Sequence, residues 1–253
     1  MRGRPRAPVS QPAEEVALKA IQCGFDPHRG HVNHEHEHDH DFDPETMYTQ
    51  ETWDARYAES DRIWSGRPNK LLVDEVAGLM PGRALDVGCG EGADAVWLAG
   101  RGWRVTALDV SEVALARVRE HALEAGVADR VETLHHDLMA DGAVPGRYDL
   151  VSAFFFQPPP ETFEGFYRGL ADLVEPGGTL LVVGHHPDDI HSGARRPHGP
   201  QLMFTSEQVV ALLDPEVWDV VTEQSPTREQ AGPEGPVTVR DSVTRAVRRR
   251  THR

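Results

Sequence analysis

The chain has 253 residues, enough to bury a complete core, and its 26 Lys and Arg face 41 Asp and Glu, a formal net charge of −15. Such an acidic chain is poorly suited to a nucleic-acid backbone, and no apolar run approaches the roughly 18 residues of a membrane span. We therefore expect no nucleic-acid partner and no membrane insertion. Cys23 and Cys89 lie far apart and predict neither a disulfide framework nor a cysteine metal site, which favours a reducing, cytoplasmic location.

Residues 1–46 form a polar, histidine-rich extension that cannot bury enough apolar surface to become ordered, so we predict a flexible segment. In an extended chain four histidines fall on one side, and imidazole binds divalent transition metals such as Zn²⁺ or Ni²⁺. These are His34, His36, His38 and His40. The spacing is not that of a closed tetrahedral site. Weak divalent metal binding by this segment and a solvated linker both remain open.

From residue 47 onward the pattern is that of one folded domain, residues 47–253. Helical patterns at 49–64 and 69–80 precede an alternation of strands and helices. The predicted strands are 83–88, 104–110, 130–137, 148–156 and 179–186, and the helices between or after them are 93–102, 111–126, 160–174 and 205–213. Two last strands, 218–225 and 237–249, are joined by a turn-rich loop. This order predicts an α/β, Rossmann-like, doubly wound and mostly parallel seven-stranded sheet with a C-terminal antiparallel hairpin.

A glycine-rich turn, "ALDVGCGEGADAV" at 84–96, joins the first of these strands to its helix. Gly88, Gly90 and Ala93 have a spacing that suits either a dinucleotide or S-adenosylmethionine. Asp86 would repel a pyrophosphate but suits the positive amino group of a methionine moiety. Asp109, which ends the second strand, suits the ribose hydroxyls that both ligands share.

The third strand adds a further acid, in "HHDLM". Asp137 is placed for an adenine amino group, and Leu138 offers a backbone donor and an apolar face. Together with Asp86 and Asp109, these residues favour S-adenosylmethionine as the cofactor.

The stretches "LDVGCGEG", "VTALDVS", "HHDLM", "YDLVSAFFF" and "LVEPGGTLLVV" are similar to successive motifs of the class I S-adenosylmethionine-dependent methyltransferases, over about residues 50 to 248. The resemblance implies methyl transfer to a small-molecule acceptor by in-line displacement. Within the motifs it adds Cys89, Val110 and Phe154 to the cofactor-binding candidates.

The leader "WDARYAESDRIWSGRPN" resembles that of the thiopurine and tellurite-resistance small-molecule methyltransferases. The resemblance implies that Trp64 covers the cofactor and that Arg67 approaches its carboxylate. The alternatives are core packing for Trp64 and a solvated side chain for Arg67.

The catalytic residues are left open by the sequence. "GHHPDD" follows a strand at the carboxyl edge of the sheet, where His185 or His186 could take a proton and Asp188 could orient one. The alternative is loop capping ahead of Pro187.

"FFFQPPPE" departs from the motif of methyltransferases that act on DNA bases, because Gln157 replaces its first residue and Pro160 its aromatic residue. We therefore expect a small-molecule acceptor, whose pocket Phe156 could line. Two other functions remain as alternatives: a nicotinamide-dependent oxidoreductase, and a metal-responsive cofactor-binding protein without turnover.

Overall fold

The computed structural model describes residues 46–194, 199–232 and 235–250. By its internal contacts the chain divides into two units, Met1–His40 and Asp41–Arg253, and all described residues lie in the second. The histidine-rich stretch predicted to be flexible lies outside the described residues. None of the helices in the described ranges is long and apolar enough to cross a membrane.

A central sheet organises the second unit. Its parallel strands are β1 (Arg83–Val87), β2 (Arg104–Asp109), β3 (Val131–His135), β4 (Tyr148–Phe154) and β5 (Val174–His185), and the strands β6 (Trp218–Gln224) and β8 (Gly235–Arg248) complete it. The order is β3-β2-β1-β4-β5-β8-β6, with β8 antiparallel to both of its neighbours. The predicted doubly wound, mostly parallel sheet with an antiparallel C-terminal end is confirmed.

One strand was not predicted. Residues expected to form only a loop contain β7 (Thr227–Gly232), which pairs with the first part of β8. Besides its pairing with β5, β8 therefore has two partners in succession: it pairs with β7 up to Arg240, and with β6 from Val243 onward. Composition alone suggested a turn because Pro, Gly and Glu dominate this stretch, whereas the pairing is set by the partner strand.

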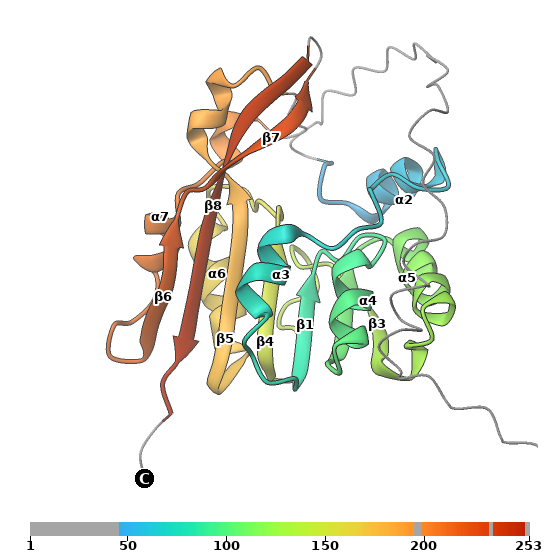
Figure 1. Ribbon diagram of the computed structural model, residues 1–253, viewed down its shortest axis with the longest axis horizontal. Coiled ribbons are helices and arrows are strands. Elements are labelled where there is room, and N and C mark those ends of the chain that lie inside the picture. Colours follow the sequence, from blue (N-terminus) through green and yellow to red (C-terminus); the bar gives the residue numbers. More distant parts are fainter. Residues whose placement is uncertain (1–45, 195–198, 233–234, 251–253) are drawn as a thin grey trace, which may run out of the picture. The chain divides into compact units, whose positions relative to one another are not determined.

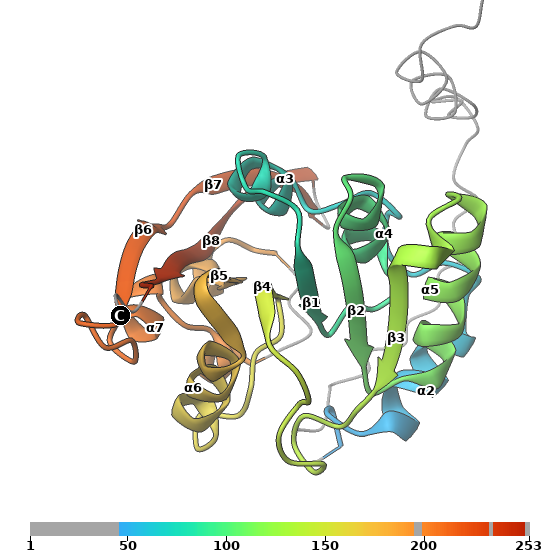
Figure 2. The same cartoon turned by 90° about the horizontal axis from the view of Figure 1, so that it is seen from below.

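Helices cover both faces of the sheet (Figures 1 and 2). One face packs against α3 (Lys70–Val76), α4 (Ala93–Gly100) and α5 (Glu112–Glu124), and the other against α6 (Phe163–Asp172) and α7 (Ser206–Val210). α5 begins with a cap, because Ser111 Oγ accepts a hydrogen bond from the Ala114 N–H at 3.1 Å. Short 3₁₀ helices η1 (Ala128–Arg130), η2 (Pro187–His191) and η3 (Pro200–Leu202) lie in the connections.

Two segments lie beyond the carboxyl ends of the parallel strands (Figure 1). α2 (Gln50–Ala58) lies on the side of α5, and the β7–β8 hairpin continues past the end of β5. In doubly wound sheets ligands bind at this edge, at the point where the strand order reverses, which here lies between β1 and β4.

Candidate functional site

Five polar or aromatic residues share one face of the sheet. Side chains alternate between the faces of a strand, and Ala84, Ala107, Val183 and Val243 all pack in the core under α3, α4 and α5. The same alternation places four side chains two residues nearer the carboxyl edge: Asp86, Asp109 and His185, and on the antiparallel β8 Asp241, which precedes Val243. Phe154 packs against the same core. The candidate site is therefore this face at the carboxyl edge.

The turn after β1 has a backbone that favours glycine. Gly88, Gly90 and Gly92 have φ angles of 64°, 52° and 80°, in the left-handed region. A Cβ on Gly88 would lie 3.2 Å from Cδ2 of Phe156, and one on Gly90 would lie 2.9 Å from the hydroxyl of Tyr57. The turn is therefore bare backbone with aromatic side chains close by.

Asp86 is a buried carboxyl group, 3% exposed, on this turn's side of the sheet. Its Oδ2 has no hydrogen-bond partner among the described residues. Burial raises the pKa of Asp86 well above its usual range, and the nearby Asp94 and Asp109 raise it further. Such a carboxyl group is stabilised in its charged form by a cationic partner, as the sequence prediction for Asp86 requires.

Asp109 holds the glycine turn. Its Oδ2 accepts a hydrogen bond from the Gly90 N–H at 2.9 Å, and its Oδ1 accepts one from the Ser111 N–H at 2.9 Å. Burial raises the pKa of Asp109, and these hydrogen bonds oppose the shift. The neighbouring Val110 is half-buried, and its carbonyl oxygen lies 2.9 Å from Nε2 of His135.

Asp137 follows β3 and shapes the turn there. Its Oδ1 accepts hydrogen bonds from the N–H groups of Met139 and Ala140 at 2.8 and 3.2 Å. Leu138 is partly buried against the core on the α6 side. Phe154, the last residue of β4, is partly buried against the opposite core.

The thiol of Cys89 is held in its neutral form. Burial raises its pKa, and the carboxyl groups of Asp109 and Asp86 raise the pKa further. The backbone N–H of Cys89 donates to the carbonyl oxygen of Leu108 at 2.9 Å, which ties the turn to the end of β2.

Trp64 lies next to the glycine turn. A Cβ on Gly90 would be 3.3 Å from Nε1 of Trp64, and this indole N–H donates to the hydroxyl of Tyr57 at 3.1 Å. Trp64 is 44% exposed, so it does not belong to the core. Arg67 is exposed, and the structure gives its guanidinium group no partner among the described residues.

Glu91, inside the glycine motif, attaches the segment before α3 to the turn. Its carboxylate accepts hydrogen bonds from the N–H groups of Ile63 and Trp64. It also forms an ion pair with the Arg117 guanidinium, with 2.7 Å between Nη1 and Oε1. Burial alone would raise the pKa of Glu91, but these bonds outweigh it and keep the pKa below its usual range. Sequence reasoning missed Glu91 and Tyr57. The signal for Glu91 was a charged side chain within a turn otherwise made of small residues.

The histidine candidates separate in the structure. His186 serves as a cap, because its Nδ1 accepts a hydrogen bond from the Asp188 N–H at 3.1 Å at the start of η2. Asp188 lies beside His186, and not beside His185. The carboxylate next to His185 is that of Asp241, with 3.8 Å between Nδ1 and Oδ1. Sequence reasoning missed Asp241, although a charged residue in the middle of the pattern "VTVRDSVT" was a signal.

Metal binding finds no support in the described ranges, where no cluster of three potential ligands occurs. The four histidines of the proposed metal site, residues 34 to 40, lie outside them.

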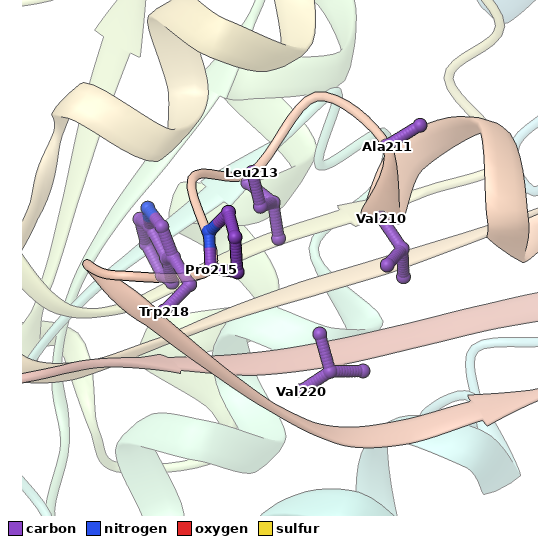
Figure 3. A pocket seen from close by; sticks show the side chains of 6 residues that line it. All are labelled: Val210, Ala211, Leu213, Pro215, Trp218 and Val220. Carbon is purple, nitrogen blue, oxygen red and sulfur yellow. The ribbon is translucent and has the colours of Figure 1, made fainter.

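Two cavities lie away from the candidate site. One, of about 330 Å³, lies between α7 and β6 and is lined by Val210, Ala211, Leu213, Pro215, Trp218 and Val220 (Figure 3). The other, of about 360 Å³, includes Arg83 and Arg104 at the amino ends of β1 and β2. Neither contains the polar side chains gathered at the carboxyl edge.

Comparison with known protein families agrees with this geometry. A family described as a methyltransferase domain matches residues 84–178. A ubiquinone biosynthesis O-methyltransferase from Pseudomonas aeruginosa is 36% identical over 110 residues, which are 44% of this chain and 47% of that protein. The enzyme of the same name from Burkholderia ambifaria is 34% identical over 130 residues, 51% of this chain and 55% of that protein. The chain thus spans about half the length of the curated relatives it matches.

Solved structures show the same fold. A structure from work on the conversion of a disulfide bond into a thioacetal group in echinomycin biosynthesis has a TM-score of 0.63 and 22% identity, covering 80% of this chain and 93% of its own. TehB from Haemophilus influenzae has a TM-score of 0.61 and 18% identity, covering 78% and 67%. The matches confirm the fold of this chain, and the family match confirms the resemblance that the sequence motifs carry.

Proposed function

We propose that this chain, which carries a class I S-adenosylmethionine-dependent methyltransferase domain, transfers the methyl group of that cofactor to a small-molecule acceptor by in-line displacement. The observation that carries the proposal is the buried Oδ2 of Asp86, which has no hydrogen-bond partner among the described residues, beside a turn of positive-φ glycines. A buried carboxylate of this kind requires a cationic or donor group.

The residues present suit this cofactor. The amino group of the methionine moiety is a cation that Asp86 would hold. Asp109 would accept from the ribose hydroxyls, and Asp137 with Leu138 would hold the adenine. Cys89, Val110 and Phe154 would line the site, and Trp64, which lies against Gly90, would cover it. For Arg67, approach to the cofactor carboxylate rests on the resemblance alone.

The cofactor supplies an electrophilic methyl group on a sulfonium. The chain's contribution is then position and electrostatics: a fixed turn and fixed carboxylates that hold the reactants in line. Several kcal/mol of the barrier is the order of magnitude that such positioning contributes.

Three further parts of the proposal concern context. Residues 47–253 are the catalytic domain, and the histidines at 34 to 40 are a candidate weak site for divalent metal, with a solvated linker as the alternative. The likeness of the leader to that of thiopurine and tellurite-resistance enzymes, together with Trp64 next to the turn, supports an acceptor of small size. The chain works in the cytoplasm, because Cys23 and Cys89 indicate no disulfide framework.

Calorimetric titration with S-adenosylmethionine, S-adenosylhomocysteine and NADH tests the proposal. We expect binding of the first two and none of NADH, since Asp86 would repel a pyrophosphate. Binding of NADH alone would favour the oxidoreductase. Binding of S-adenosylmethionine with no transfer to any acceptor, together with a metal response that is lost on deleting residues 1–46, would favour the metal-responsive binding protein.

A further inference from the structure

We propose that His185 removes the proton from the acceptor's nucleophile and that the acceptor is therefore a hydroxyl compound. Asp241 orients the imidazole of His185 and balances the positive charge that the imidazole gains. Arg228 and Phe155 are positioning residues for this pair. The inference deepens the proposed function, because it assigns the proton acceptor and the class of acceptor at the same edge of the sheet.

His185 and Asp241 are directly paired residues of two neighbouring strands. His185 is the last residue of β5, and its cross-strand partner on β8 is Asp241. Both are buried, at 7% and 1% exposure, and 3.8 Å separates Nδ1 of His185 from Oδ1 of Asp241. Catalytic hydrogen bonds often reach their final length only when substrate is bound. At 3.8 Å this contact is an ion pair and not a hydrogen bond, and a carboxylate beside one ring nitrogen raises the basicity of the imidazole.

Arg228 fixes the carboxylate. It reaches from β7 and binds Asp241 through two nitrogens, with Nε–Oδ2 at 2.6 Å and Nη2–Oδ1 at 3.2 Å. Burial by itself would raise the pKa of Asp241, but the contacts with His185 and Arg228 outweigh it and keep the pKa below its usual range. Asp241 therefore stays charged at neutral pH, as a partner for an imidazolium must.

Phe155 fixes the imidazole. Its ring stacks on that of His185, with centroids 4.6 Å apart and planes at 28°, and the Arg228 guanidinium lies 5.9 Å from its centroid. Phe155 has a φ of 57°, the one positive value at a non-glycine residue in the described ranges. Such strained residues concentrate at functional sites, where the surrounding contacts hold them. Here the N–H of Phe155 donates to the Val183 carbonyl oxygen at 2.7 Å.

The position of the pair relative to the cofactor turn suits an acceptor between them. β4 lies between β1 and β5, so about 10 Å separates the strand of Asp86 from that of His185. Phe156, which follows Phe155, lies against Gly88 and stacks on Phe166 at 4.8 Å. Aromatic rings thus lie between the turn and the base, which favours a flat, apolar acceptor.

The acceptor oxygen bonds to the methyl carbon while the carbon–sulfur bond breaks, and that electron pair stays on sulfur. The hydroxyl proton passes to Nε2 of His185, and the imidazolium is stabilised by Asp241. A hydroxyl needs this step, whereas a neutral amine attacks through its lone pair and an acidic thiol is already ionised at neutral pH.

The test has two parts, and the first does not depend on turnover. The pKa of His185 is measured by NMR in the wild type, Asp241→Asn and the control His191→Gln, which changes an exposed histidine of η2. We expect Asp241→Asn to lower the pKa of His185 by about one unit or more, because a charged partner is lost. The other charged or titratable groups nearby are Arg228, Arg240, His186, Asp188 and Asp189, and all are kept in these variants. An unchanged pKa overturns the proposal.

The second part uses phenol, thiophenol and aniline, which is a neutral amine at pH 7, as probes with labelled cofactor. We expect phenol methylation to fall about 100-fold or more in His185→Gln, with thiophenol and aniline much less affected. The rate of phenol methylation is expected to rise with pH as His185 loses its proton, and in Asp241→Asn this rise should occur at lower pH. A purely structural role of Asp241 would not shift the pH profile. Equal phenol rates in wild type and His185→Gln, or no phenol methylation by the wild type, overturn the proposal.

The titration of S-adenosylhomocysteine separates the two proposals. His185→Gln and Asp241→Asn are expected to bind it within about twofold of the wild type. If the wild type does not bind S-adenosylhomocysteine, the proposed function is contradicted. If the wild type binds it and the pKa of His185 is unchanged in Asp241→Asn, only this inference is contradicted.

Discussion

Asp109 accepts a hydrogen bond from the backbone N–H of Gly90 at 2.9 Å, so the last residue of β2 fixes the turn that follows β1. The same carboxylate accepts from the Ser111 N–H. Asp109→Ala leaves both donors buried without a partner. We expect the binding free energy of S-adenosylhomocysteine, measured by calorimetry, to become less favourable by about 1 to 3 kcal/mol. The melting temperature should fall as well. Asp129→Ala, at an exposed acid in η1, is the control and should change neither. Unchanged affinity in Asp109→Ala would remove the ribose role.

Asp86→Asn is expected to stabilise the protein while weakening cofactor binding. The pKa of Asp86 is raised in the folded chain by burial and then by Asp94 and Asp109. A raised carboxyl pKa contributes stability below the unfolded value of about 3.9, and this contribution is lost as pH rises through the folded pKa. Without added cofactor, the melting temperature of Asp86→Asn should therefore exceed that of the wild type at pH 7. The gap should close toward pH 4. A less stable variant at pH 7 would contradict this account.

The pH dependence of cofactor binding follows from the same residue. A proton on Asp86 competes with the cationic amino group, so wild-type affinity should fall as pH is lowered through the raised pKa. Calorimetry over a pH series measures this, and Asp86→Asn should bind weakly with a flatter profile. If the affinity of the wild type does not decrease as the pH is lowered, Asp86 does not face a cation.

Gly92 and Gly126 offer a matched pair for the turn. Both have positive φ, 80° and 69°, but a Cβ on Gly92 would lie 2.8 Å from Cγ2 of the buried Val118, whereas Gly126 has open space around it. We expect Gly126→Ala to destabilise by about 1 to 2 kcal/mol from backbone strain. Gly92→Ala should cost about 1 to 3 kcal/mol more, from overpacking. Denaturant unfolding measures both.

Val118→Ala provides the control for that clash. The double variant Gly92→Ala with Val118→Ala should lose less free energy of unfolding than the two single variants lose in sum. The reason is that the smaller side chain at residue 118 makes room for the new methyl group. Simple additivity would show that the contact with Val118 is not what excludes a side chain at residue 92.

Glu91→Gln is expected to loosen the segment that Glu91 holds. The low pKa of Glu91 means that its stabilising contribution is present above the unfolded value of about 4.3 and is lost as pH falls through the folded pKa. Hydrogen exchange of the Ile63 and Trp64 amides should be about tenfold faster in Glu91→Gln at pH 7. In the wild type, protection should decrease on acidification. Equal protection in both proteins would show that Glu91 does not hold the segment.

Much of the fold was predictable because its signals are local. The apolar strands, the Ser111 cap and the alternation of strands and helices each depend on a few neighbouring residues. The carboxyl-edge positions of Asp86 and Asp109 followed from strand ends in the same way. β7 was missed because its formation depends on β8 and not on its own composition.

The remaining parts of the site depend on contacts between distant residues. Asp241 lies 56 residues from His185 in sequence, and only the antiparallel register of β5 and β8 brings them together. The sequence suggested Asp188 as the orienting acid because it is close in sequence, yet it lies beside His186. Tyr57 likewise reaches Gly90 only through the packing of α2.

β8 runs without interruption from its pairing with β7 to its pairing with β6, and this limits where the length of the chain can be changed. Inserting or deleting one residue between Arg240 and Val243 would turn every following side chain to the opposite face. Insertions at the hairpin tip, beyond Gly232 and before Gly235, leave that alternation intact. Insertions are therefore best placed between Gly232 and Gly235, and length changes within the strand are best made two residues at a time.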